Sequence, residues 1–262
     1  MKQFFSRRRP TVIALLLVLV AVFPVDQAAA QAMQAPAPAG SAPVDPTDPY
    51  ESWNRKVYTF NETIDRWVLK PVAQAYRTFT PKLVDRGITN FFNNLSELRN
   101  FSNSLLQLKG ESAVVAVGRF TFNTIFGLGG LIDVATAMDL PEQPEDFGQT
   151  LGYWGAGSGP YLMLPFLGPS TPRHLGGFVT DVMALPSAWD AVESPEHYFA
   201  RAVQVVDKRA DLIPAESFVS GDSYIFLRNA FLQRREFMIN DGKVINDPFA
   251  SGDDEDLMLE NF

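Results

Sequence analysis

The sequence predicts an all-α fold with an irregular central segment. Apolar residues recur every three or four positions in five stretches of the chain, which is the period of an amphipathic helix. Strict alternation of polar and apolar residues is scarce, and no turn signal of weight joins two apolar strands. Between residues 127 and 177, eleven glycines and six prolines break both patterns.

The first 30 residues have the pattern of a secretory signal peptide. A basic start is followed by the apolar run from Val12 to Phe23 and by an Ala-x-Ala cleavage site at residues 28–30. Such a run, twelve residues long, extends about 18 Å as a helix, short of the roughly 30 Å hydrocarbon core of a bilayer. We therefore expect export and cleavage, with a retained short anchor as the alternative.

The rest of the chain divides by composition into three parts. Residues 31–47 are rich in alanine and proline without an apolar face, which is typical of a disordered linker. Residues 48–245 carry the helical patterns. Residues 246–262 include a run of four acids and are typical of a disordered acidic tail.

Three helices are expected in the first half of the domain. Asp48 and Pro49 form a start signal, and the helix that follows should stop before Pro71. Pro81 starts a second helix, which runs toward Gly110. The third covers residues 111–126 and is apolar almost all round, so we expect it to be buried or to face lipid. The apolar stripe of the first helix consists of Trp53, Val57, Phe60, Ile64 and Trp67.

Two further helices are expected after the central segment. One begins at Ser194-Pro195 and extends to Leu212. The other covers residues 223–239 and ends before Asn240-Asp241-Gly242. The breaker-rich segment between the two sets carries too many aromatic and large apolar side chains to be disordered. It is either the partly apolar lining of a cavity or groove or a large buried Ω-loop.

The charge and composition exclude several classes of function. The net charge is −8, and removal of the basic leader makes it more negative, which argues against nucleic-acid binding. The absence of cysteine excludes thiol nucleophiles, thiolate metal sites and disulfides.

No catalytic or metal site is predicted, and no cofactor. His174 and His197 lack a second ligand three or four residues away. Ser158 is flanked by Ala156 and Pro160 where a hydrolase nucleophile elbow needs glycines. We therefore expect a protein that is not an enzyme.

Three blocks of residues resemble the MlaA family, also called VacJ, over about residues 48–242. The first block opens the domain, the second spans the end of the third helix and the central segment, and the third lies in the last helix. They comprise residues 48–55 with Tyr58, Phe60 and Asn61; Arg119-Phe120, 123–127, Gly129-Gly130, Ile132-Asp133, Phe147-Gly148, 150–152, Gly157, 159–161, 164–166 and Gly168; and Asp222, Tyr224, Arg228, Ala230 and Gln233-Arg234.

The resemblance implies a ring of amphipathic helices in the inner leaflet of the bacterial outer membrane, enclosing an amphipathic channel. It implies that the protein removes misplaced phospholipids from the outer leaflet, works with a trimeric porin, and passes the lipid to a periplasmic carrier protein. It implies no catalytic activity. The phospholipid path is expected to involve Phe60, Asn61, Gly157, Ser158, Gly159, Tyr161, Leu164 and Phe166; for Phe60, packing on the helix stripe is the alternative.

The chain departs from the family pattern in one respect. Family members are usually lipoproteins anchored through a cysteine after the signal peptide, and this sequence has none. Attachment to the membrane would then depend on apolar surface, the porin or an uncleaved signal segment. A soluble periplasmic lipid-binding carrier remains the alternative function, whereas a lipase is disfavoured by the missing elbow.

Overall fold

The computed structural model describes residues 45–185 and 196–243, and all of them except Asp45 belong to a compact unit that begins at Pro46. The expected signal peptide, residues 31–44 of the expected linker, and the expected acidic tail lie outside the described residues. The all-α fold class is confirmed, because the sheet in the described residues is a single two-stranded hairpin.

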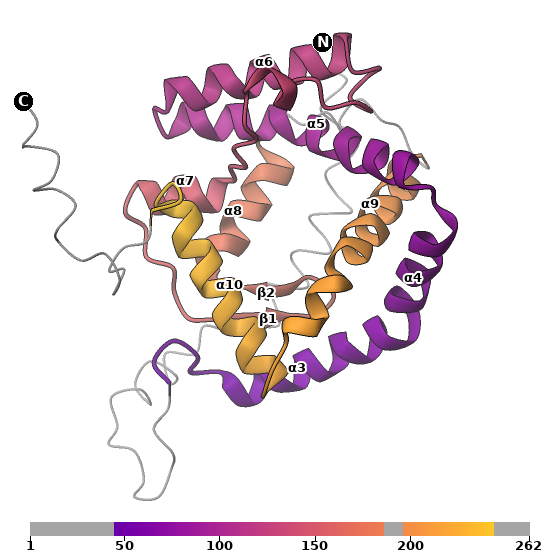
Figure 1. Ribbon diagram of the computed structural model, residues 1–262. Coiled ribbons are helices and arrows are strands. Elements are labelled where there is room, and N and C mark those ends of the chain that lie inside the picture. The colour runs from indigo at the N-terminus through magenta and orange to yellow at the C-terminus, as the bar shows by residue number, and fades with distance from the viewer. Residues whose placement is uncertain (1–44, 186–195, 244–262) are drawn as a thin grey trace, which may run out of the picture. The chain divides into compact units, whose positions relative to one another are not determined.

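The helices expected from apolar periodicity are present (Figure 1). Apart from the end of the first one, the long helices begin and end within a few residues of the predicted positions, although Ser194 and Pro195 themselves lie outside the described residues. They are α3 (Glu51–Ile64), α5 (Lys82–Leu106), α6 (Gly110–Ile125), α9 (Glu196–Leu212) and α10 (Ser223–Ile239).

The predicted stop before Pro71 is wrong. The chain stays helical through a π-helical turn, η1 (Asp65–Leu69), and then α4 (Lys70–Phe79). The Lys70 N–H donates to the Asp65 carbonyl five residues earlier, so the turn is wider than an α-helical one. Proline removes one hydrogen bond and crowds the carbonyl four residues back, and a π turn is one local adjustment that lets the helix continue.

The central segment is ordered, as predicted, but it is more regular than expected. It contains α7 (Phe147–Tyr153), α8 (Pro172–Met183), a short 3₁₀ turn and a hairpin of β1 (Leu162–Leu164) with β2 (Gly168–Ser170). Some of the glycines that interrupt the sequence pattern have a packing role here. An added Cβ at Gly177 of α8 would lie 2.2 Å from the Gly148 nitrogen of α7, so glycine lets the two helices approach closely.

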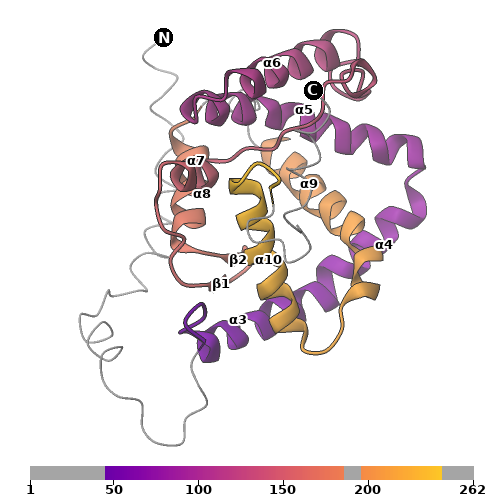
Figure 2. The ribbon, with the colours of Figure 1, turned by 60° about the vertical axis from the view of Figure 1, so that its left-hand side comes forward.

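The pairwise packing of the elements closes on itself. In order, α3 packs on β1, β2 on α10, α10 on α7, α7 on α5, α5 on α9, α9 on α4, and α4 joins η1 and α3. In addition, α6 packs along α5 and α8 along α7. Figures 1 and 2 show α3, α4, α9, α5, α7 and α10 following one another around this circuit. The circuit is consistent with the ring that the resemblance implies.

Candidate functional site

The described residues have an inverted distribution of polarity. In a water-soluble domain, large apolar side chains are mostly buried and charged ones are rarely fully buried. Here the largest fully buried side chains are mainly polar or charged, whereas 35 large hydrophobic residues are exposed. The fully buried polar and charged side chains include Arg119, Gln107, Gln149, Glu97, Asn54, Asn100, Asn103, Thr150, Asp48 and Asp207.

Helices α5 and α6 both show this inversion. In the second half of α5 and at its C-cap, a buried polar residue recurs every three or four positions, in the order Asn94, Glu97, Asn100, Asn103 and Gln107. Outward-facing positions of α6 carry apolar side chains instead, with Val114 73% and Ile125 65% exposed. Helix α6 is the nearly all-apolar third helix that the sequence predicts, and it therefore exposes part of its apolar surface. This surface is chemically suited to lipid acyl chains.

Arg119 is the centre of the buried polar network. Its guanidinium donates to the Glu97 carboxylate at 2.6 Å, to the Leu140 carbonyl at 2.5 Å and to Asp133 at 3.2 Å. Both Arg119 and Glu97 are almost completely buried. The ion pair joins α5 to α6, and the other two bonds fix the loop that follows α6.

The β-hairpin is held to α3 by two asparagines that stand two helical turns apart. Asn54 donates to the Tyr161 carbonyl at 3.1 Å and accepts from the Met163 N–H at 2.9 Å. Asn61 donates to the Leu164 carbonyl at 2.9 Å and accepts from the Phe166 N–H at 2.8 Å.

The spacing of the two asparagines matches the strand. Seven residues of helix rise about 10.5 Å, and three residues of strand rise about 10 Å. The two side-chain amides therefore take the place of a neighbouring strand along β1. The sequence analysis placed Asn61 at the lipid path but missed Asn54; the signal was a pair of asparagines seven residues apart in an amphipathic helix.

The tip of the hairpin is apolar and exposed. Phe166 is 76% exposed and has a positive φ of 63°, which is unusual for a bulky residue. Its ring meets the ring of Phe60 edge to face, with 5.3 Å between centroids. Phe60, Asn61, Leu164 and Phe166, four of the predicted lipid-path residues, thus lie together at one place.

The other predicted residues lie elsewhere. Tyr161 is fully buried and packs against Tyr224 and Phe231 in the small apolar core, and Leu164 is buried at the base of the tip. Gly157, Ser158 and Gly159 form the loop after α7, where the Ser158 carbonyl accepts from the Arg173 N–H. Gly157 and Gly159 are exposed. Their part in a lipid path stays a prediction.

Asp48 does not cap α3, which begins after Tyr50. Its buried carboxylate instead accepts hydrogen bonds from Asn54 at 2.8 Å and from the Tyr224 hydroxyl, and it pairs with Arg228 at 3.3 Å. Burial, together with the adjacent Asp48 carboxylate, raises the pKa of Tyr224. The first residue of the family motif thereby ties the start of α3 to α10.

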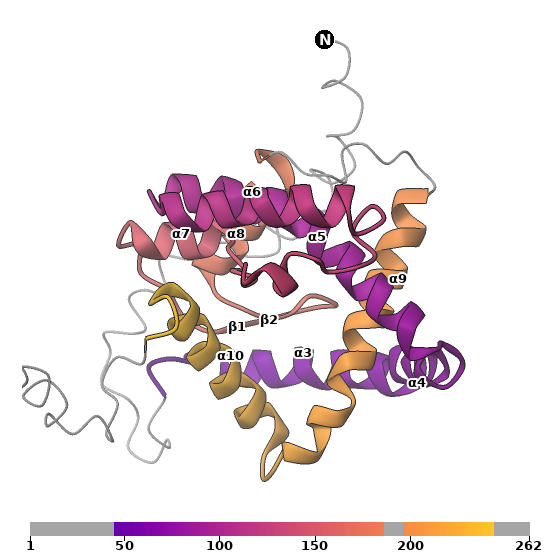
Figure 3. The ribbon, with the colours of Figure 1, turned by 45° about the horizontal axis from the view of Figure 1, so that its top comes forward.

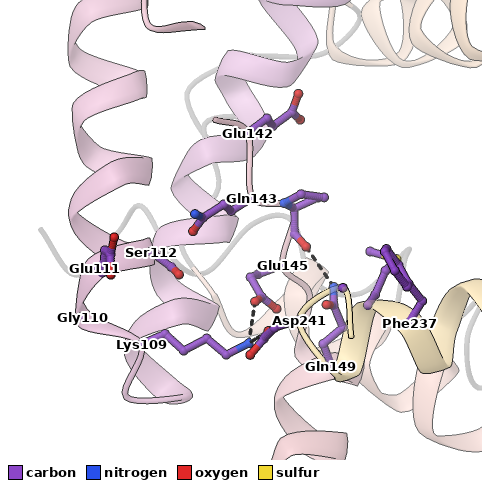
Figure 4. A pocket seen from close by; sticks show the side chains of 13 residues that line it. Lys109, Gly110, Glu111, Ser112, Glu142, Gln143, Glu145, Gln149, Phe237 and Asp241 are labelled. Atoms are coloured by element: carbon purple, nitrogen blue, oxygen red, sulfur yellow. Dashed lines mark hydrogen bonds and ion pairs between the residues drawn. The ribbon is translucent and has the colours of Figure 1, made fainter. Parts of the chain in front are cut away.

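A pocket of about 590 Å³ lies between the start of α6, residues 142–145 and the end of α10 (Figure 4). The Lys109 side chain forms part of the lining and makes ion pairs with Glu145 at 3.0 Å and with Asp241. Glu111 and Glu142 add further negative charge to the lining. None of the predicted lipid-path residues lines this pocket, and its acidic lining disfavours an anionic ligand.

Arg235 on α10 holds the start of α7 through Asp146. The guanidinium makes two hydrogen bonds to the Asp146 carboxylate, at 2.5 and 2.9 Å. Burial alone would raise the pKa of Asp146, but the hydrogen bonds and charge of Arg235 outweigh it and hold this pKa at about 2, below the ordinary 3.8.

The ion pair of Arg235 and Asp146 is expected to make the stability of the fold sensitive to acid. A lowered pKa in the folded state means that the carboxylate stabilises the fold above pH 3.8 and loses this effect as the pH falls through about 2. The contribution is about 2 kcal/mol. We expect the unfolding free energy of the wild type, measured by urea titration, to fall by about that much more between pH 5 and pH 2 than that of D146N. The exposed Asp139→Asn variant is the control and should follow the wild type; a D146N profile parallel to the wild type would contradict the role of the pair.

No group of three histidine or acidic residues suited to a metal ion occurs among residues 45–185 and 196–243. His174 lies 3.1 Å from the Ser170 hydroxyl, but that serine is buried. Burial and the charge of Arg235 lower the pKa of His174. In the same ranges, no helix is both long enough and apolar enough to cross a membrane.

The fold and the site define an all-α protein that buries its charged and amide side chains and exposes apolar ones. The family model described as MlaA lipoprotein matches residues 46–238. The chain belongs to this family.

Named relatives and a solved structure agree with the family match. The chain is 38% identical over 212 residues to the intermembrane phospholipid transport system lipoprotein MlaA of Haemophilus influenzae, covering 79% of this chain and 85% of that protein. It is 36% identical over 220 residues to the protein of the same name of Escherichia coli K12, covering 80% and 86%. A solved structure described as "Structural basis for maintenance of bacterial outer membrane lipid asymmetry" matches with a TM-score of 0.67 and 36% identity, over 74% of this chain and 99% of that one.

Proposed function

We propose that this protein is the outer-membrane component of an intermembrane phospholipid transport system. It removes misplaced phospholipids from the outer leaflet through an amphipathic path and delivers them on the periplasmic side to a carrier protein, without catalysing a reaction. A porin trimer is its partner in the membrane.

The main support for this proposal is the inverted distribution of polarity, with polar side chains buried and large apolar ones exposed. Exposed apolar side chains on α4, α6 and α9 suit contact with acyl chains, and the buried amides and charges stabilise a structure that has no large apolar core. The named relatives, which are components of a phospholipid transport system, support the substrate class.

The loop of Gly157 offers a test of the path. An added Cβ at Gly157 meets no atom within 4 Å, so G157V is expected to fold. The added side chain should narrow the proposed lipid path beside this loop. Gly159 is unsuitable, because its φ is +74° and a Cβ would lie 2.9 Å from Pro172. In cells that lack their own copy of the gene, we expect G157V to leave outer-leaflet phospholipid several-fold higher than the wild type does, measured by labelling of surface-exposed lipid.

The matched control is G176V, at an exposed glycine of α8 with open space around its Cα. Normal outer-leaflet phospholipid in G157V would remove this loop from the path. Failure of the wild-type gene to lower outer-leaflet phospholipid would overturn the proposed function itself.

A soluble periplasmic carrier is the alternative that the absence of cysteine favours. The exposed aromatic residues Trp67, Phe79 and Phe166, each at least 76% exposed, favour the membrane component. We expect the protein to remain with the membrane fraction after carbonate washing. Its quantitative release in soluble form would support the carrier.

A further inference from the structure

A group of four charged side chains, here called the charge ring, spans the π turn between α3 and α4. Asp65 is the first residue of η1, and Lys70 is the first residue after it. Arg209 comes from the last turn of α9, and Glu216 comes from η4 (Pro214–Phe218), the short 3₁₀ helix that follows α9. Figures 1 and 3 show α9 running toward the helix that α3 and α4 form.

The contacts within the charge ring are short and continuous. The Arg209 guanidinium makes two hydrogen bonds to the Asp65 carboxylate, at 2.6 and 2.8 Å, and pairs with Glu216 as well. The Glu216 carboxylate also accepts from the Lys70 ammonium at 2.6 Å. The hydrogen bonds from Lys70 and Arg209 hold the pKa of Glu216 below its ordinary value. The four side chains alternate in charge, and they link both ends of η1 to α9 and η4.

The π turn that the charge ring spans is a weak point of the helix. Pro71 has no N–H to donate, and its ring crowds the carbonyl of Trp67 four residues earlier. Prolines and π turns are the places where helices bend sharply. A helix with such a turn bends there at low cost unless contacts with another element fix its direction. The bidentate pair of Arg209 with Asp65 is such a contact, because it joins the turn to a different helix.

The π turn lies close in sequence to the residues that hold the hairpin tip. Asn61, four residues before Asp65, accepts from the Phe166 N–H, and the Phe60 ring meets the Phe166 ring. The tip therefore follows the end of α3. Helix α9 packs on α4 and α5, beyond the turn. The pair of Arg209 with Asp65 thus bridges the two sides of the bend, and the angle of the bend sets the separation between the hairpin tip and α9.

We infer that the charge ring is a latch that fixes the angle between α3 and α4, and that Arg209 is a positioning residue for the lipid path at the hairpin tip. The inference rests on the proposed function, which gives the tip a part in that path. With the latch closed, Phe60 and Phe166 stay at one distance from α9. With the latch open, the helix bends at η1, and the width of the proposed path varies.

A distance measurement tests the latch. The chain has no cysteine, so spin labels on two introduced cysteines report a single distance. L167C at the hairpin tip and V205C on α9 are exposed positions outside the charge ring. In the full-length protein in detergent micelles, double electron–electron resonance should give one narrow distance distribution. R209Q should shift or spread it by about 5 Å, the rise of one helical turn. R209K keeps the charge without the planar fork and should lie between the two.

The matched control is R66Q, next to Asp65 in the chain. It breaks the exposed pair of Arg66 with Glu62 and leaves the charge ring intact, so it should keep the wild-type distance. In cells that lack their own copy of the gene, R209Q should leave outer-leaflet phospholipid several-fold higher than R66Q does, measured by labelling of surface-exposed lipid.

The distance and the lipid level separate the possible failures. A wild-type distance in R209Q overturns the latch and leaves the proposed function intact, because the charge ring then only stabilises the fold. A shifted distance with normal outer-leaflet phospholipid overturns the positioning role of Arg209. Failure of the wild-type gene to lower outer-leaflet phospholipid overturns the proposed function, and with it that role. If circular dichroism shows that R209Q is unfolded, D65N, which leaves Arg209 paired with Glu216, gives the same comparison.

Discussion

Replacement of Arg119 by methionine is expected to lower the unfolding free energy by about 3–5 kcal/mol, a large part of the roughly 5–15 kcal/mol by which a typical domain is stable. The change leaves the Glu97 carboxylate buried without its cation. Burial already raises the pKa of Glu97, with the hydrogen bond and charge of Arg119 opposing it. The Leu140 carbonyl and Asp133 lose their donor as well. Urea unfolding in detergent, followed by circular dichroism, measures the effect.

Two further variants test the cause of this loss. E97Q/R119M removes both charges and should recover part of the lost stability, because no unpaired charge remains buried. R66M breaks the exposed pair with Glu62 on α3 and should cost less than about 1 kcal/mol. A loss for R119M as small as that for R66M would mean that the buried network does not stabilise the fold.

The sequence predicted the helices but not which face of each helix is buried. Val84 and Leu105 follow the helical period of α5, yet both are 49% exposed, while polar residues between them such as Glu97 and Asn100 are buried. Apolar periodicity reports which residues share a face, and the assignment of that face to the inside assumes water on the outside. The sequence pattern alone could not show whether water or lipid surrounds the outer faces of the helices, so this inference had to come from the structure and the family.

Other features depended on contacts between distant residues. Pro71 ends a helix by the usual rule, and only the widened turn of η1 lets the helix pass it. Gly148 and Gly177 are separated in sequence and needed for one close approach, so single-sequence reasoning took both as signs of irregularity.

Loss of Asn54 is expected to release the β-hairpin from α3 and to cost about 3 kcal/mol. Its buried side chain makes three hydrogen bonds, to Asp48, Tyr161 and Met163, and N54A leaves those partners unpaired at about 1 kcal/mol each. N61A removes two bonds at a partly exposed position and should cost about 1 kcal/mol. Thermal or urea unfolding gives both values.

Amide hydrogen exchange distinguishes the two asparagines individually. The Met163 N–H donates to Asn54 and the Phe166 N–H donates to Asn61, so N54A should accelerate exchange chiefly at Met163 and N61A chiefly at Phe166. N90A, which removes one solvent-exposed bond to the Leu131 carbonyl, should change neither amide. If both amides exchange at the wild-type rate in N54A and N61A, the hairpin is held by its other contacts with α10, and α3 does not serve as the neighbouring strand.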